Sequence, residues 1–391
     1  MKKTTCLFIA LIIVLVFCTG AAFAGETREF TDDLGRGVTL PVEIDSVAPS
    51  GMLAQVIIYA VAPESLATVA SPLNSAEKVY LDPRLQNLEV TGSFYGAKST
   101  MNPEEIMQLD RMFGFDAVID LGTVKKGIAD DLNSIQEKTG VNFVFISQDK
   151  LEDYPTSFRR MGELLNRPET AGRQAAYLEN LLSEVDENMQ KVPKRATMIY
   201  VTMVDGNSVY LIGSGENSEH GDAINKVAVN VAPPAVSVKG IGDVYSMEQI
   251  LMLDPDYIIV GQPDSGDYYN MIMTSPSWQS LRAVQEGHVY ESPKDPYPWM
   301  GNPRSVNRFL SLLWLGNLFY PEVFDFNMQD RAVEFYDLFY HHTLTDAEYK
   351  GMTEHSFAGS GALVPESGKS PVPLAGLIIG LAAAVFAVRR K

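Results

Sequence analysis

Two stretches of the chain share one order of apolar and polar positions. Residues 101–122 (MNPEEIMQLDRMFGFDAVIDLG) and 245–262 (YSMEQILMLDPDYIIVGQ) each begin with a helical pattern that has acidic residues near its start, continue with Leu-Asp, and end in a β-rich stretch. A helix that leads into a buried strand is half of a parallel α/β unit. The copies lie about 144 residues apart. This spacing indicates two similar lobes rather than a solenoid, whose period is roughly 20–50 residues.

Further short apolar runs predict the other strands. Several are apolar throughout, as expected when both faces of a sheet are covered by helices. Helical patterns over residues 53–62, 126–139 and 223–227 separate most of them. The predicted strands are residues 46–49, 66–70, 115–121 and 141–146 in the first half, and residues 197–202, 209–212, 257–260 and 288–291 in the second.

A single long helix is predicted between the two halves. After Pro168, apolar residues recur near helical spacing at Ala175, Leu178, Leu182 and Val185, and residues 173–192 contain neither Gly nor Pro. Such a helix spans about 35 Å at 1.5 Å per residue. The predicted fold class is therefore α/β, with two lobes that each have a central, mainly parallel sheet flanked by helices, joined by one long helix.

The two ends of the 391-residue chain carry patterns typical of targeting. Residues 1–24 read as a signal peptide, with Lys2 and Lys3 before an apolar run and small residues at Ala22 and Ala24. A lipid anchor on Cys18 is the competing interpretation. Both cysteines of the chain lie in this segment, so cleavage leaves an exported domain without disulfides or thiolate chemistry.

The C-terminal end predicts a tether. Residues 357–372 are rich in Gly, Ser and Pro and read as a flexible spacer, and residues 373–388 are apolar and precede Arg389, Arg390 and Lys391. We expect a transmembrane or sorting segment over 373–391; its order also resembles the C-terminal signals of archaeal surface proteins. The predicted organisation is a signal peptide (1–24), an N-terminal lobe (25–167), a linking helix (168–192), a C-terminal lobe (193–356), a spacer and this anchor.

Composition and motifs exclude several functions. The net charge of −18 disfavours nucleic acid as a partner. Neither a G-x-S-x-G nor an H-E-x-x-H motif occurs, and GSFYGAKST (92–100) departs from a phosphate-binding loop in its spacing. We therefore expect no enzyme, no catalytic residue and no intrinsic cofactor, and the sequence names no metal ligand.

Candidate binding residues lie in loops after predicted strands, because ligands of α/β sheets bind outside the carboxyl ends of strands. One such loop, PYPWMGNPRSVNR (296–308), places Trp299 near Arg304, a combination that suits a flat or anionic ligand. The alternative is an ordinary surface turn with a helix cap. The other candidate loops include Ser50-Gly51, Ser93 to Tyr95, Thr123, residues 214–220 and residues 264–269.

Glu104 and Glu248 occupy matching positions in the two repeats, NPEEI and SMEQI. A carboxylate near a helix N-terminus is favoured by the helix dipole, so capping alone accounts for them. Their pairing across two lobes also predicts that both carboxylates are presented to one partner surface.

The order of these segments resembles the class III periplasmic binding proteins of ABC transporters, which carry ferric siderophores, haem and corrinoids. The similar segments are FTDDLGRGVTLP (30–41), SVAPSGMLAQVIIYAVAPESLATVAS (46–71), the two repeats, and WQSLRAVQEGHVYESP (278–293). The resemblance implies delivery of a small-molecule ligand to a permease and its ATPase, with Glu104 and Glu248 docking on the permease. It implies ligand contacts from the cleft loops, for which the candidates are Ser93, Tyr95, His220, Trp299, Arg304 and Asn307.

Three functional hypotheses follow. The first is an extracytoplasmic, membrane-tethered binding protein of an ABC importer that captures an iron(III) chelate, or else a corrinoid or haem. The second is a molybdate or tungstate carrier that uses Arg304 and loop amides. The third, from another class, is a surface enzyme such as a hydrolase, which the missing motifs disfavour.

Overall fold

The computed structural model describes residues 26–94, 101–215, 218, 221–236, 241–261, 267–301 and 303–358. The predicted signal peptide and the predicted C-terminal anchor lie outside these residues. No helix in the described ranges is both long and apolar enough to cross a membrane.

The N-terminal lobe is built on a parallel sheet with the strand order β3-β6-β7. A hairpin of β1 and β2, which the sequence analysis did not anticipate, precedes it. The elements are β1 (Thr27–Thr31), β2 (Gly37–Pro41), β3 (Val47–Pro49), α2 (Met52–Val61), β4 (Thr68–Val69), α3 (Glu77–Tyr80), β5 (Glu89–Val90), α4 (Pro103–Phe113), β6 (Ala117–Gly122), α5 (Ile128–Thr139), β7 (Phe143–Ser147) and α6 (Tyr154–Leu164).

The C-terminal lobe has a mixed sheet with the order β11-β9-β8-β12-β13, in which β10 also pairs with β8. Strands β8, β12 and β13 are parallel, whereas β9 is antiparallel to both of its neighbours. The elements are β8 (Thr197–Asp205), β9 (Ser208–Leu211), α8 (Gly221–Val227), β10 (Val229–Asn230), β11 (Asp243–Ser246), α9 (Met247–Leu253), β12 (Tyr257–Val260), α10 (Tyr268–Thr274), α11 (Arg282–Gln285), β13 (Val289–Glu291), α12 (Arg308–Phe319), α13 (Met328–Tyr340) and α14 (Asp346–Met352).

The two repeats found in the sequence occupy equivalent places in the two sheets. Helix α4 leads into β6 between β3 and β7, and α9 leads into β12 between β8 and β13. In each repeat, the aspartate just before the strand accepts hydrogen bonds from residues at the start of the neighbouring strand. The Asp116 carboxylate accepts hydrogen bonds from the backbone N–H groups of Asp45 and Ser46, and the Asp256 carboxylate accepts them from the N–H and hydroxyl of Thr197.

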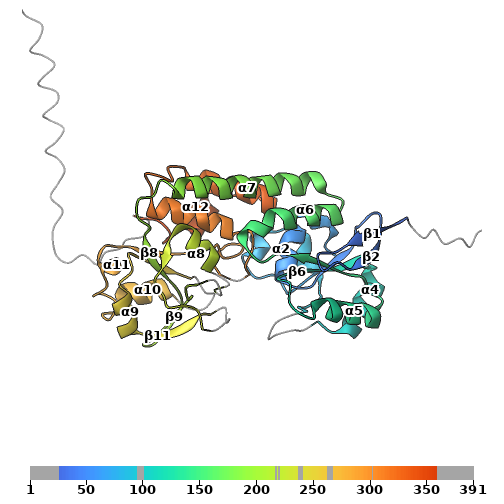
Figure 1. Ribbon diagram of the computed structural model, residues 1–391, viewed down its shortest axis with the longest axis horizontal. Coiled ribbons are helices and arrows are strands. Elements are labelled where there is room, and N and C mark those ends of the chain that lie inside the picture. Colours follow the sequence, from blue (N-terminus) through green and yellow to red (C-terminus); the bar gives the residue numbers. More distant parts are fainter. Residues whose placement is uncertain are drawn as a thin grey trace, which may run out of the picture. The chain divides into compact units, whose positions relative to one another are not determined.

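Helix α7 (Pro168–Met189) links the lobes, and Figure 1 shows it running alongside α6 and α12. Its buried Gln174 donates hydrogen bonds to the carbonyl of Ala60 in α2 and to that of Leu338 in α13. Buried residues of α2, α6, α7, α12 and α13 form one continuous apolar core, and each lobe has a further core of its own. The predicted fold class is confirmed. A hinge motion between the lobes would have to break this shared core.

Candidate functional site

Polar residues gather at the carboxyl ends of the parallel strands of the N-terminal lobe. Ser50 follows β3, and its hydroxyl donates a hydrogen bond to the buried carboxylate of Asp120 near the end of β6. Ser93 lies at the same edge, because a Cβ on Gly51 would come within 3.6 Å of its Oγ. This is the edge at which ligands of α/β proteins bind.

A cavity of about 360 Å³ opens at the end of β6 and combines residues of both halves of the chain. Lys125 and Lys126 come from the loop before α5, whereas Arg304 comes from the loop before α12. In the described part of the chain, none of these three cations takes part in an ion pair. With Asp120 and Asp131 also in its lining, the cavity has more cations than carboxylates, in a chain whose net charge is −18. Its lining is Leu53, Asp120, Leu121, Gly122, Thr123, Lys125, Lys126, Ile128, Asp131, Phe145 and Arg304.

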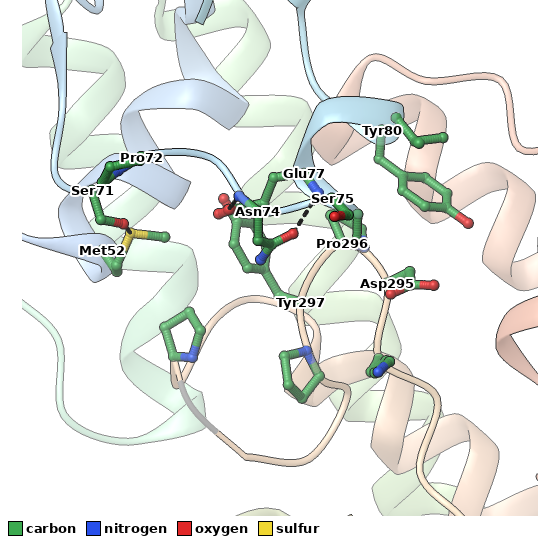
Figure 2. Close-up of a pocket in the computed structure, with 15 residues that line it drawn as sticks. Met52, Ser71, Pro72, Asn74, Ser75, Glu77, Tyr80, Asp295, Pro296 and Tyr297 are labelled. Carbon is green, nitrogen blue, oxygen red and sulfur yellow. Dashed lines mark hydrogen bonds between the residues drawn. The ribbon is translucent and has the colours of Figure 1, made fainter. Parts of the chain in front are cut away.

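A second, larger cavity of about 1070 Å³ lies between residues 71–80 of the N-terminal lobe and residues 294–303 (Figure 2). Buried Glu77 is at its wall, where its carboxylate accepts a 2.8 Å hydrogen bond from the backbone N–H of Asn74 and a hydrogen bond from the Tyr297 hydroxyl. Burial raises the pKa of Glu77, although both hydrogen bonds act in the opposite direction. Glu77 and Tyr297 thus connect the two lobes at the cavity wall.

The two cavities adjoin each other. Met52 lines the larger cavity and Leu53 the smaller one, and in the same way Pro303 lines the larger and Arg304 the smaller. Consecutive residues of α2 and of the loop before α12 therefore separate them. We treat the two cavities as one candidate binding site.

Buried tyrosine hydroxyls hold the loop that carries Arg304. These tyrosines come from α6, β8 and α13, so the loop is fastened from both lobes. Loops fixed in this way lose little conformational entropy when a ligand binds. The hydrogen bonds run from Tyr154 to the Arg304 carbonyl (2.7 Å), from Tyr200 to the Met300 carbonyl (2.8 Å) and from Tyr336 to the Asp295 carbonyl.

Trp299 and Asn307 are buried inside this loop and do not line either cavity. The Trp299 indole has no exposed surface, packs edge-on against Trp314, and its N–H donates to the Tyr336 hydroxyl. The Asn307 amide donates to the Tyr297 carbonyl and accepts from the Tyr340 hydroxyl. Both side chains are therefore enclosed by protein and lie away from the two cavities. The sequence could not show this, because the tyrosines that enclose them come from α13.

Of the other predicted ligand contacts, Arg304 lines the smaller cavity, together with Thr123. Ser93 is half-buried beside Gly51. Tyr95 and His220 lie outside the described residues. Arg304, Ser93 and Thr123 therefore lie at one edge of the sheet. Trp299 and Asn307 are buried away from this edge.

Four site residues were missed from the sequence: Lys125, Lys126, Asn74 and Glu77. The two lysines directly follow a predicted strand and Thr123, so the rule that led to Thr123 could have found them. No sequence signal marks Glu77, because it becomes a site residue only where the loop that carries Tyr297 covers it.

Glu104 and Glu248 are both exposed, and each lies in the first turn of its helix. Asn102 caps α4 by accepting a hydrogen bond from the backbone N–H of Glu104. Ser246 caps α9 in a reciprocal arrangement with Gln249. The Glu248 carboxylate also accepts hydrogen bonds at this helix start, from the Ser246 hydroxyl and from its own backbone N–H, and these lower its pKa.

Within the residues that the structure describes, no group of three or more His, Cys, Asp or Glu side chains could hold a metal ion.

Comparisons with known proteins agree with this architecture. The sequence model of the family described as periplasmic binding protein matches residues 117–296. A solved structure, the ABC transporter solute binding protein from Sulfurospirillum deleyianum, superposes with a TM-score of 0.72 at 24% identity and covers 83% of this chain and 98% of that chain. The fold is that of the two-lobed periplasmic binding proteins.

Two curated relatives, both from Bacillus subtilis, are similar over part of the chain. The iron-uptake system-binding protein is 26% identical over 158 residues, which are 38% of this chain and 48% of the relative. The Fe(3+)-citrate-binding protein YfmC is 22% identical over 141 residues, which are 36% of this chain and 42% of the relative. The matched regions thus span less than half the length of each relative.

Proposed function

We propose that this chain is an extracytoplasmic solute-binding protein of an ABC importer, and that its ligand is an anionic iron(III) chelate. The observation that carries the proposal is the cavity at the carboxyl end of β6, where Lys125 and Lys126 of one lobe and Arg304 of the other converge without ion-pair partners in the described chain. Charge-assisted hydrogen bonds from such groups are roughly twice as strong as neutral ones. The relatives named for iron uptake support the choice of an iron chelate.

The remaining parts of the proposal concern partners and location. Glu104 and Glu248 dock on the permease, one from each lobe, and an ATPase drives transport. The chain is exported by residues 1–24 and tethered to the cell membrane by residues 373–391. The protein binds and releases its ligand without a covalent step.

Native mass spectrometry of residues 26–358 tests this function. The purified protein is incubated separately with ferric citrate, haem, cobalamin and molybdate. We expect a one-to-one complex with the ferric chelate. Arg304→Ala should weaken it by about 1.5–3 kcal/mol, the usual contribution of a hydrogen bond to a charged group, and Arg304→Lys should weaken it less. A complex with molybdate and none with ferric citrate would overturn the iron assignment in favour of an oxyanion carrier.

A further inference from the structure

A third cavity, of about 310 Å³, meets the larger cavity at the end of α3, because Val79 and Tyr80 line both. Figure 2 shows Tyr80 at the edge of the larger cavity. The rest of the lining comes from the end of α2, from the segment after α3 and from the two residues that follow α13. Asp82 supplies a carboxylate, and within the described chain neither Lys nor Arg lines this cavity. The neighbouring Arg84 guanidinium donates instead to two backbone carbonyls.

Two helices, α2 and α13, end at this cavity. The His341 Nε2 donates a 3.0 Å hydrogen bond to the Ala60 carbonyl of α2, and the Tyr59 hydroxyl donates a 3.1 Å hydrogen bond to the Tyr340 carbonyl of α13. These bonds hold the two C-terminal ends against each other. A helix C-terminus carries partial negative charge and favours a nearby cation. Neither helix has a basic residue in its last turn to supply one.

Aromatic rings form the walls of the cavity. Tyr59 packs against His341 with ring centroids 5.9 Å apart, and Tyr80 packs against His342 with centroids 5.1 Å apart. Both tyrosines are buried. The face of such a ring carries negative charge density and attracts an ammonium group, and tyrosine is among the side chains that bind cations in this way.

Negative charge also surrounds the Tyr80 ring. Burial raises the pKa of the Tyr80 hydroxyl, and the negative charges of Asp295 and Glu348 raise it further. The Glu348 carboxylate lies close to the cavity wall, since it accepts a 3.1 Å hydrogen bond from the Nε2 of His342. The electrostatic environment of the cavity is therefore the opposite of that at the end of β6, where cations outnumber carboxylates.

We propose that this third cavity binds a small organic cation, an alkylammonium ion that lies against the rings of Tyr59 and Tyr80 with Asp82 as its counter-ion. At roughly 30 Å³ for each water molecule, a volume of about 310 Å³ corresponds to on the order of ten waters, which suits a ligand of few atoms. The site does not depend on the proposed function, because its charge excludes an anionic solute. The bound cation contacts α3, the element that also carries Glu77 of the larger cavity.

Calorimetric titration of residues 26–358 with choline tests the proposal. The matched probe is dimethylbutanol, the neutral analogue of choline in which carbon replaces the nitrogen. We expect one choline per chain and at least roughly tenfold weaker binding of the neutral analogue, because only the cation is attracted to the ring faces. Tyr80→Leu should weaken choline by roughly tenfold.

Asp82→Asn localises the site and carries the test if Tyr80→Leu fails to fold. Asparagine keeps the hydrogen bond that the Asp82 side chain accepts from the Arg84 N–H, so the melting temperature should stay near that of the wild type. Choline should bind roughly threefold more weakly, the order for an exposed charge pair, and dimethylbutanol should be unaffected. Asp325→Asn, at an exposed position that lines none of the three cavities, is the control and should bind choline normally.

Three outcomes would overturn the proposal. The first is equal affinity for choline and dimethylbutanol, which would show that charge is not recognised. The second is unchanged choline affinity in folded Asp82→Asn and Tyr80→Leu proteins, which would move the cation to another part of the chain. The third is binding to phosphatidylcholine vesicles without binding of free choline, which would indicate a lipid headgroup instead of a free cation.

Discussion

The Tyr154 hydroxyl donates a 2.7 Å hydrogen bond to the backbone carbonyl of Arg304 and joins α6 of the N-terminal lobe to the loop before α12. The Tyr154 ring is buried and packs edge-on against Phe309 in the first turn of α12. Tyr154 therefore fixes Arg304 relative to the lobe that supplies Lys125 and Lys126. Three cations from distant parts of the sequence are held together in this way.

Tyr154→Phe should weaken ligand binding in a protein that still folds. The phenyl ring keeps the packing against Phe309, and loss of the hydroxyl leaves a carbonyl unpaired at a cost of about 1–3 kcal/mol. We expect several-fold weaker binding of ferric citrate by calorimetry. Tyr349→Phe, a buried tyrosine of α14 that lines neither cavity, is the control. Unchanged affinity with reduced stability would show that Tyr154 only supports the fold.

Trp299→Ala should act on stability. Removing a fully buried aromatic side chain costs about 3–5 kcal/mol of unfolding free energy, and Trp299→Phe should cost less. Urea denaturation measures this change, while titration of the folded protein with ferric citrate should show a nearly unchanged dissociation constant. Weak binding by a Trp299→Phe protein of wild-type stability would show instead that the Trp299 indole contacts the ligand.

Glu77 should make the free energy of unfolding depend on pH. Its pKa is raised in the folded protein above the ordinary value of 4.5, so the folded state binds the proton more tightly than the unfolded state. Its contribution is therefore most favourable below about pH 4.5 and is lost as the pH rises through the raised pKa. Relative to Glu77→Gln, the wild-type protein should become less stable from acid to neutral pH. A constant difference across pH 4–8 in urea titrations would contradict this prediction.

Replacing Glu104 and Glu248 together by Arg should abolish transport and leave binding intact. Exposed charges contribute little to stability, so the melting temperature and the ligand dissociation constant should stay near their wild-type values. Uptake of radioactive iron by cells should fall to background, because repulsive contacts replace attractive ones at the permease. The control with the same charge change is Glu137→Arg with Glu169→Arg, at two other exposed positions. Normal uptake by the first pair would leave both glutamates as ordinary helix-start residues.

Deletion of residues 359–391 should release the folded protein into the medium. The cut falls after Ala358 because the Phe357 ring still contacts Tyr349 of α14, and the compact unit ends at Ala358. Immunoblots of membrane and medium fractions measure the release, and the melting temperature should match that of the full chain. Retention of the truncated chain at the membrane would point to a lipid on Cys18 instead.

The sequence by itself determined the architecture. The repeated helix–strand unit placed α4 before β6 and α9 before β12, and the helical pattern after Pro168 predicted α7. These predictions succeed because apolar periodicity reports burial within one element and its nearest partners. Strand β9 was predicted, over residues 209–212, but β11 (Asp243–Ser246) was not, and the antiparallel pairing of both was missed because pairing direction depends on which strand lies alongside.

Only the tertiary structure decided which residues form the site. Trp299 and Arg304 are five positions apart in one loop, yet Trp299 is enclosed by α13 and Arg304 reaches a cavity built by β6 and α5. Glu77 becomes a cavity residue because a loop more than two hundred positions later covers it. Composition and local pattern describe what a segment could do, but exposure, ion pairing and the pKa of a buried carboxyl are set by neighbours that are distant in the chain.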